Sequence, residues 1–350
     1  MSGKRWAVRG FCDKVCVFAE QKKEKARHED EPCVIGRVSS RWIEFTSQTG
    51  NFRGCTVIYD GCVGIREGEC EMKYNKINVN GIQIFYRECG DADKPIMVLF
   101  HGFPSASHMF RDLMPKLEDR FHLIAPDYPG FGQSESPSRE EFNYTFDHLA
   151  EVMSDFLKEI HVEKFYMYVF DYGAPIGFRI AMNRPESILG IVSQNGNVYE
   201  EGLGKKWEAR AEYWQNPTLE LREQYKSAFA KETVIGQYTF GTEDGSVAPD
   251  GYSLDLYYAA TIPDYAEKQS DLIFDYQNNV KLYPAFQEYL RKYQPKLLAI
   301  WGKDDPSFIW SGAEAFAKDL PDARIIPLNS GHFALENCCG EIADSILKFF

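Results

Sequence analysis

The residue that most constrains the chemistry of this chain is Asp171. It follows an apolar run, 165–170, that predicts a buried strand, and it precedes residues 175–182, which predict a packed helix. Gly173 and Ala174 are small enough to let such a helix and strand approach each other closely. A sharp turn between a strand and a helix exposes its central side chain for attack. A carboxylate there can bond to an electrophilic carbon, so the sequence predicts an ester intermediate on the enzyme.

The elements that must position Asp171 are short apolar strands that alternate with helices. Asn80-Gly81 separates two alternating segments and predicts a tight hairpin, because both residues tolerate positive φ. Residues 149–160 have helical spacing. The predicted strands lie at 76–79, 82–86, 96–100, 122–125, 165–170, 188–192, 297–301 and 323–328. The pattern predicts an α/β fold with a mostly parallel sheet and helices on both faces.

About a hundred residues between the strands at 188–192 and 297–301 have a different character, rich in tyrosine and tryptophan. A structureless loop of that length is unusual in a compact domain. We therefore expect an inserted helical cap at about 197–290. It should lie over the carboxyl edge of the sheet, where open α/β sheets bind ligands.

The first 71 residues show neither helical nor strand periodicity over any length, and they carry 12 Lys plus Arg against 11 Asp plus Glu. We expect residues 1–71 to be a poorly structured extension, and residues 72–350 to form the catalytic domain. Alternatives are an over-extended gene start with Met72 as the first residue, or a targeting or metal-binding arm. The cysteines of this segment match no zinc pattern and no secretory signal is visible, which predicts a cytoplasmic protein with free thiols.

Composition excludes two classes of partner. The chain has 350 residues, 44% hydrophobic and 26% charged, with a net charge of −13. An acidic chain with no basic stripe is not expected to bind nucleic acid. No apolar run approaches the ~20 residues that a membrane-spanning helix needs. Composition leaves the oligomeric state open.

Five motifs in chain order carry a family resemblance. They are His101-Gly102-Phe103-Pro104, the turn from Asp127 to Ser134, Asp171-Tyr172-Gly173, the turn from Trp301 to Asp305, and Gly331-His332-Phe333. From residue 74 onward the chain resembles the α/β-hydrolase superfamily, in the branch of epoxide hydrolases and haloalkane dehalogenases. The order nucleophile, acid, histidine is the order of that fold.

The resemblance implies a role for each catalytic residue. Asp171 would attack the substrate carbon, and His332 would take a proton from the water that hydrolyses the ester. Asp305 would orient His332 and stabilise its protonated ring. Asp304 competes with Asp305 for this role, although the family spacing favours Asp305.

The same resemblance places an oxyanion hole at the backbone N–H groups of Phe103 and Tyr172. His101 would support this loop through hydrogen bonds without transferring a proton. The scheme requires no metal and no organic cofactor. Its partners are a small apolar electrophile and water.

The residue after the nucleophile separates the subfamilies. Haloalkane dehalogenases hold the halide with a tryptophan there and commonly an asparagine in the first motif, but this chain has Tyr172 and Phe103. Fluoroacetate dehalogenases have arginines one and four residues after the nucleophile, where this chain has Tyr172 and Pro175. The chain therefore lacks both the side chains that hold a halide and the arginines that bind a substrate carboxylate.

Epoxide hydrolases use two cap tyrosines to donate hydrogen bonds to the ring oxygen. Residues 213–217 and 274–278 resemble the two cap motifs, which makes Tyr213 and Tyr276 the candidate donors. The alternative for each is core packing or a pocket wall. We expect epoxide hydrolysis to a diol. A haloalkane or haloacid dehalogenase or another α/β-hydrolase activity is the second reading, and a receptor-like protein that binds a ligand without turnover is the third.

Overall fold

The computed structural model describes two units, residues 1–71 and 72–350, and within the first unit only four strands. The described residues are 6–8, 17–19, 34–38, 41–45 and 72–350. Strand β1 (Trp6–Val8) pairs antiparallel with β2 (Val17–Ala19), and β3 (Val34–Val38) pairs antiparallel with β4 (Arg41–Phe45). The expectations of a poorly structured extension, a later start or a metal-binding arm concern residues that lie mainly outside those described.

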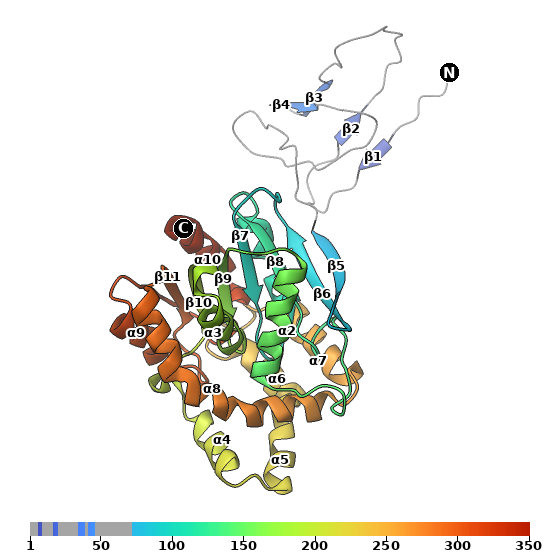
Figure 1. Cartoon of the computed structure of the whole chain (residues 1–350). Helices are drawn as coiled ribbons and strands as arrows, with labels where there is room; N and C mark the ends of the chain where they lie inside the picture. The colour runs from blue at the N-terminus through green and yellow to red at the C-terminus, as the bar shows by residue number, and fades with distance from the viewer. Residues whose placement is uncertain (1–5, 9–16, 20–33, 39–40, 46–71) are drawn as a thin grey trace. The chain divides into compact units, whose positions relative to one another are not determined.

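The second unit is built on an eight-stranded sheet with the order β12-β11-β10-β9-β7-β8-β6-β5 (Figure 1). Its strands are β5 (Lys73–Val79), β6 (Ile82–Cys89), β7 (Ile96–Phe100), β8 (His122–Pro126), β9 (Phe165–Phe170), β10 (Ile188–Gln194), β11 (Leu297–Gly302) and β12 (Arg324–Leu328). All pairings from β8 through β12 are parallel, whereas β6 is antiparallel to both β8 and β5. The predicted mostly parallel sheet is confirmed.

The hairpin at the sheet edge follows from its two turn residues. Asn80 and Gly81 have φ of 53° and 93°, and Val79 pairs with Ile82 across them. Positive φ at both central positions is the geometry whose twist matches that of the flanking strands. The hairpin therefore forms where the sequence predicted it.

Helices cover both faces of the sheet, as the alternation of side chains along β9 shows. A Cβ added at Gly177 of α3 would meet Met167 and Val169. Tyr166 and Tyr168 point to the other face, where they pack against Phe350 and Phe110. The core helices are η1 (Ser107–Phe110), α1 (Met114–Leu117), α2 (Phe146–Glu159), α3 (Gly173–Asn183), η2 (Pro185–Ser187), α9 (Trp310–Asp319) and α10 (Leu335–Phe349). Odd and even residues of a strand face opposite sides, so two layers of helix enclose β9.

The segment between β10 and β11 is helical, as expected for a cap. It contains η3 (Glu200–Gly202), α4 (Lys206–Gln215), α5 (Leu219–Tyr225), η4 (Lys226–Phe229), α6 (Lys231–Thr239), α7 (Asp250–Thr261) and α8 (Tyr265–Tyr293). Figure 1 shows α8 running across one end of the sheet, with α4 and α5 beyond it. The boundary expected at about 290 falls inside the last turn of α8.

One buried arginine joins the cap to the core. Arg179 of α3 donates to Asp147 of α2 at 2.5 Å and to Asn279 of α8 at 2.7 Å. A charged group at 5% exposure needs such partners, because an unpaired buried charge is strongly unfavourable. The two bonds fix α8 against the α2–α3 layer. Among the residues that the structure describes, no helix is long and apolar enough to cross a bilayer.

Candidate active site

Asp171 lies in a tight turn between β9 and α3. Its φ is 49°, in the left-handed region that non-glycine residues rarely adopt, and its carbonyl accepts a hydrogen bond from the Ala174 N–H at 3.0 Å. The turn brings α3 so close to β7 that a Cβ at Gly173 would lie 2.2 Å from the Phe100 carbonyl oxygen. Only glycine fits there. The sequence pattern therefore predicted both the turn and the need for a small residue after it.

Two backbone N–H groups hold the carboxylate of Asp171. The Phe103 N–H donates to Oδ1 at 2.7 Å, and the backbone of Tyr172 also hydrogen-bonds to this group. A Cβ at Gly102 would lie 2.4 Å from the Cβ of Asp171, so the loop approaches closely only because residue 102 is glycine. The two predicted oxyanion donors thus both lie at the carboxylate of Asp171.

His101 supports this loop from beneath. Its ring stacks on Tyr128 with centroids 4.0 Å apart, Nδ1 lies 3.2 Å from the Gly102 carbonyl, and Nε2 accepts from the Tyr128 N–H at 3.3 Å. Burial lowers the pKa of His101 to about 4, against opposing carboxylates and a backbone hydrogen bond. The ring is therefore neutral near pH 7, which suits the supporting role that the sequence predicted.

His332 lies between Asp305, the predicted acid, and Asp171, the predicted nucleophile. Its Nδ1 lies 2.6 Å from Oδ2 of Asp305, and its Nε2 lies 3.6 Å from Oδ2 of Asp171. Burial acts to lower the pKa of His332, but the carboxylates of Asp305 and Asp171 outweigh it and raise the pKa above its usual value. Asp171 is 7% exposed, and burial raises its pKa although His332, the two backbone donors and Arg210 oppose this.

Asp305 is held by a set of donors that the sequence did not reveal. Its Oδ1 accepts from the Ser307 N–H at 2.7 Å, and its Oδ2 accepts from Asn195 Nδ2 at 2.9 Å as well as from His332. Asn195 also bonds the backbone of Gly302 and has a φ of 48°. An asparagine directly after a strand, where left-handed backbone is tolerated, is the signal that could have indicated it.

Asp304 does not take part in this cluster. Its side chain is exposed, and its backbone N–H donates to the Ser330 carbonyl at 3.1 Å. Asp305 is 2% exposed and contacts the His332 ring. Of the two adjacent acids, the structure brings Asp305 to the histidine.

Aromatic rings of the cap and of the loop after β11 lie over Asp171, Asp305 and His332. Trp207 of α4 lies 4.3 Å from the Tyr276 ring and 5.3 Å from the Phe308 ring, centroid to centroid. Phe308 lies 6.0 Å from the His332 ring, and Tyr276 lies 6.0 Å from Tyr172. This layer excludes bulk water from the nucleophile. Trp207 of the cap and Phe308 of the loop after β11 were not predicted, since neither residue belongs to a pattern with distinctive spacing.

Tyr276 and Tyr213 have different surroundings. Tyr276 is fully buried, and burial raises its pKa well above the usual value, with the hydroxyl of Tyr283 and the carboxylate of Asp171 adding to the effect. Its hydroxyl lies 3.2 Å from that of Tyr283, which is also bonded by Asn197 Nδ2 at 3.3 Å. Tyr283 lies two turns after Tyr276 on α8, a spacing that places both on one helix face.

Tyr213 lies among cap residues rather than beside the triad. Its ring packs against Tyr225 at 5.0 Å and Phe274 at 5.3 Å, and its hydroxyl hydrogen-bonds to Arg222. Tyr213 and Tyr276 were predicted as a pair, but the structure pairs Tyr276 with Tyr283. The spacing of the cap motif did not define which face of α4 turns toward Asp171.

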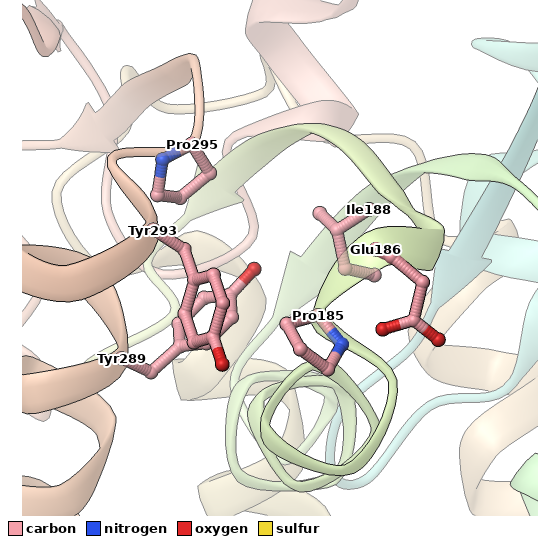
Figure 2. Close-up of a pocket in the computed structure, with 6 residues that line it drawn as sticks. All are labelled: Pro185, Glu186, Ile188, Tyr289, Tyr293 and Pro295. Atoms are coloured by element: carbon pink, nitrogen blue, oxygen red, sulfur yellow. The ribbon is translucent and has the colours of Figure 1, made fainter.

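A surface pocket of about 340 Å³ lies at the other end of the sheet (Figure 2). Tyr289 and Tyr293 line one side, and Pro185, Glu186 and Ile188 line the other, with Pro295 nearby. Ile188 pairs with Phe165 at the start of β9, whereas Asp171 follows its end. At ~3.3 Å per residue, six strand residues separate the two places by about 20 Å. This pocket therefore belongs to a different part of the molecule from the triad.

Comparison with known proteins agrees with this geometry. The family model described as the alpha/beta hydrolase fold matches residues 95–337. A Saccharomyces cerevisiae protein named as an uncharacterized hydrolase is 43% identical over 284 residues, covering 79% of this chain and 97% of its own. Haloalkane dehalogenase 2 of Mycobacterium tuberculosis is 27% identical over 269 residues, covering 73% and 88%.

Among solved structures, an epoxide hydrolase of Vigna radiata superposes with a TM-score of 0.64 at 19% identity, covering 80% of this chain and 97% of its own. At that identity the likeness concerns the fold. The resemblance drawn from the five motifs is confirmed by these matches. The chain therefore belongs to the alpha/beta hydrolase fold family, and it is a hydrolase.

Proposed function

We propose that this hydrolase uses Asp171 as a nucleophile and opens epoxides to diols through a covalent ester. The observation that carries the proposal is the contact set of Asp171, with Oδ1 on the Phe103 N–H at 2.7 Å and Oδ2 facing His332 Nε2 at 3.6 Å. Oδ2 is the oxygen free to attack a carbon of the ring. The carbon–oxygen bond of the ring breaks as the new ester bond forms, and the ring oxygen gains the negative charge.

The tyrosine pair on α8 supplies the proton for that oxygen. Asn197 donates to Tyr283, and Tyr283 can in turn donate to Tyr276, which leaves the Tyr276 O–H for the substrate. The raised pKa of Tyr276 keeps it protonated until charge develops on the ring oxygen. We assign the donor role to Tyr276, supported by the Tyr283 hydroxyl. Tyr213, which the sequence suggested as a second donor, has no part in this scheme.

Hydrolysis of the ester then uses the histidine. Neutral His332 accepts a proton through Nε2 from a water that attacks Cγ of Asp171, and Asp305 stabilises the resulting imidazolium. Negative charge develops on Oδ1, which the Phe103 N–H already contacts, and the Tyr172 backbone also hydrogen-bonds to this carboxyl group. The bond between Cγ of Asp171 and the product oxygen breaks, and His332 returns its proton to that oxygen. The second proton of the water restores the Tyr276 hydroxyl, Asp171 is again a carboxylate, and the diol leaves.

Dehalogenation is the second candidate because a relative carries that name and the nucleophile would be the same. It has less support, since Tyr172 and Phe103 replace the side chains that hold a halide. Turnover on a panel of epoxides and a panel of haloalkanes, with diol and halide release measured in parallel, separates the two. Diol formation without halide release is expected. Halide release alone would reverse the ranking, and turnover of neither panel would refute the proposal.

A further inference from the structure

Helix α4 carries two basic side chains, Lys206 and Arg210, four residues apart and therefore on one face. Among the described residues, neither side chain forms an ion pair or a hydrogen bond. Nearby cap cations behave differently: Arg222 binds both Glu267 and Asp271, and Lys226 binds Glu267. Unlike these two cations, the pair on α4 has no hydrogen-bonded carboxylate among the described residues.

The position of this pair is fixed by the loop that carries the catalytic acid. The Trp207 indole N–H and the Gly204 N–H both lie 2.9 Å from the Ser307 carbonyl oxygen, to which they donate. A Cβ at Gly204 would lie 2.4 Å from the carbonyl oxygen of Pro306. The start of α4 is therefore docked on the loop that follows Asp305, which fixes the position of the helix that carries the two cations.

Arg210 shares a neighbour, the Trp207 ring, with the aromatic residues around Asp171 and His332. Its guanidinium carbon lies 4.2 Å from the centre of the Trp207 ring, whose other neighbours are Tyr276 and Phe308. A guanidinium stacked on an aromatic face keeps its N–H groups free in its own plane, where they can bind a carboxylate with two hydrogen bonds.

The charges of both residues reach the triad. Arg210 lowers the pKa of Asp171 and Tyr172, although burial dominates both and raises them. Lys206 acts to lower the pKa of His332, and Asp305 acts to raise that of Lys206 against the larger effect of desolvation. An uncharged electrophile would have no use for two free cations this close to the nucleophile. An anionic one would need them, because Asp171 and Asp305 would otherwise repel it.

We propose that Arg210 and Lys206 form an anion subsite on the cap side of the active site, so that the preferred electrophile carries a carboxylate. That the reacting group is an epoxide rests on the proposed function. The anion subsite does not, because it concerns only the binding of a carboxylate. The substrate class is then an epoxy carboxylate, with its charged end at α4 and its ring at Asp171.

Binding tests the subsite without turnover. Calorimetry would compare 3-phenylpropanoate with 3-phenylpropanamide, which differ chiefly in charge. We expect the carboxylate to bind about tenfold more tightly to the native protein, as one charge-assisted pair allows. The preference should vanish in the double variant Arg210→Met with Lys206→Met. It should persist in the matched control Lys205→Met, which removes an exposed neighbouring charge.

Turnover then separates the two proposals. The substrates are 3-phenyloxirane-2-carboxylate and its amide, and we expect kcat/KM to favour the carboxylate in the native protein only. Equal binding of the two propanoic probes, no binding of either, or a preference that survives the double variant overturns the subsite. An equal loss of rate on both oxiranes in the double variant does so as well, because the cations would then act on the chemical step. Selective carboxylate binding with no oxirane turnover would support the subsite and refute epoxide hydrolysis.

Discussion

On the core side of the active site both oxygens of Asp305 have hydrogen-bond donors, whereas on the cap side Lys206 and Arg210 have no hydrogen-bond acceptor within the described part of the chain. The core side holds its polar groups with short contacts from Ser307, Asn195 and His332. The cap side presents aromatic rings, a chain of hydroxyl groups and the free charges of α4. A fully bonded carboxylate keeps one geometry, while groups left unbonded are available to a ligand.

This contrast assigns different tasks to the two sides. In the proposed scheme the core side performs the covalent steps that any substrate with an electrophilic carbon requires. The cap side determines which substrate fits and which atom receives the proton. Substitutions on the core side should therefore reduce the rate for every substrate, and substitutions on the cap side should change the relative rates among substrates.

The nucleophile should give the largest effect. Asp171→Ala removes the atom that forms the ester, so we expect kcat to fall by roughly 10⁴-fold or more on every substrate. In single turnover in heavy-oxygen water, label should enter the Asp171 side chain of the native protein, as mass spectrometry of the peptide would show. Label found only in the product would mean that water attacks the substrate directly, and the two-step scheme would fail.

The adjacent residues Asp304 and Asp305 allow a matched pair of substitutions. Asp305→Asn keeps the shape but removes the charge that orients and stabilises His332, so a fall in kcat of about 10²- to 10⁴-fold is expected. Asp304→Asn changes an exposed neighbour and should leave kcat within a factor of two of the native value, a difference of roughly 0.4 kcal/mol. Steady-state kinetics on one good substrate measures both. Similar losses in the two variants would contradict the assignment of Asp305.

The two sides also differ in how much of each could be predicted from the sequence. The bounds of β7 and β9 were predicted to the residue, because each is an apolar run closed by turn residues. Asp171, His332 and Asp305 follow strand ends, and parallel strands bring their carboxyl ends to one edge of the sheet. A correct prediction of the strands therefore also predicts where the core-side residues lie.

The cap gives no such guide. Helical spacing indicates which residues share a face, as for Tyr276 and Tyr283, but it does not say which way that face points. The direction depends on docking contacts such as that of Trp207 with Ser307, which join residues 100 positions apart. Tyr213 was for this reason predicted as a donor and Tyr283 was overlooked. Asn195 was missed because its partner, Asp305, lies 110 residues away.

The tyrosines of the cap should show a smaller effect that depends on the leaving group. Tyr276→Phe removes the proposed donor, and loss of one such donor costs about 10²- to 10³-fold in kcat. Tyr283→Phe should cost less, because it removes only the hydroxyl that supports Tyr276. Tyr213→Phe, whose ring packs against Tyr225 and Phe274, is the matched control and should retain native kcat on epoxides.

Kinetics on epoxides with poor and good leaving oxygens would sharpen this test. The loss in Tyr276→Phe should be larger for the more basic alkoxide, since that oxygen depends more on a donor. A Tyr213→Phe variant that loses as much as Tyr276→Phe would show that the hydrogen bond to Arg222 is broken in the working enzyme. The original pairing of Tyr213 with Tyr276 would then be restored.

The smallest expected effect is on the pH dependence of ester hydrolysis, and it depends on the contact between His332 and Asp171. The pKa of His332 is raised because the carboxylates of Asp305 and Asp171 outweigh burial. Esterification removes the charge of Asp171, so the pKa of His332 should fall in the intermediate. The base form of His332 is present above its pKa and is lost as pH falls through it. Ester hydrolysis should therefore continue to a lower pH than the titration of the free enzyme implies.

Two measurements check this shift. Titration of the His332 ring by NMR should give a lower pKa in Asp171→Asn, which mimics the uncharged ester, than in the native protein. Rapid-quench kinetics of ester breakdown should lose rate at the lower of these two values. If Asp171→Asn leaves the titration unchanged, the contact between Nε2 and Oδ2 at 3.6 Å carries no electrostatic coupling, and His332 is tuned by Asp305 alone.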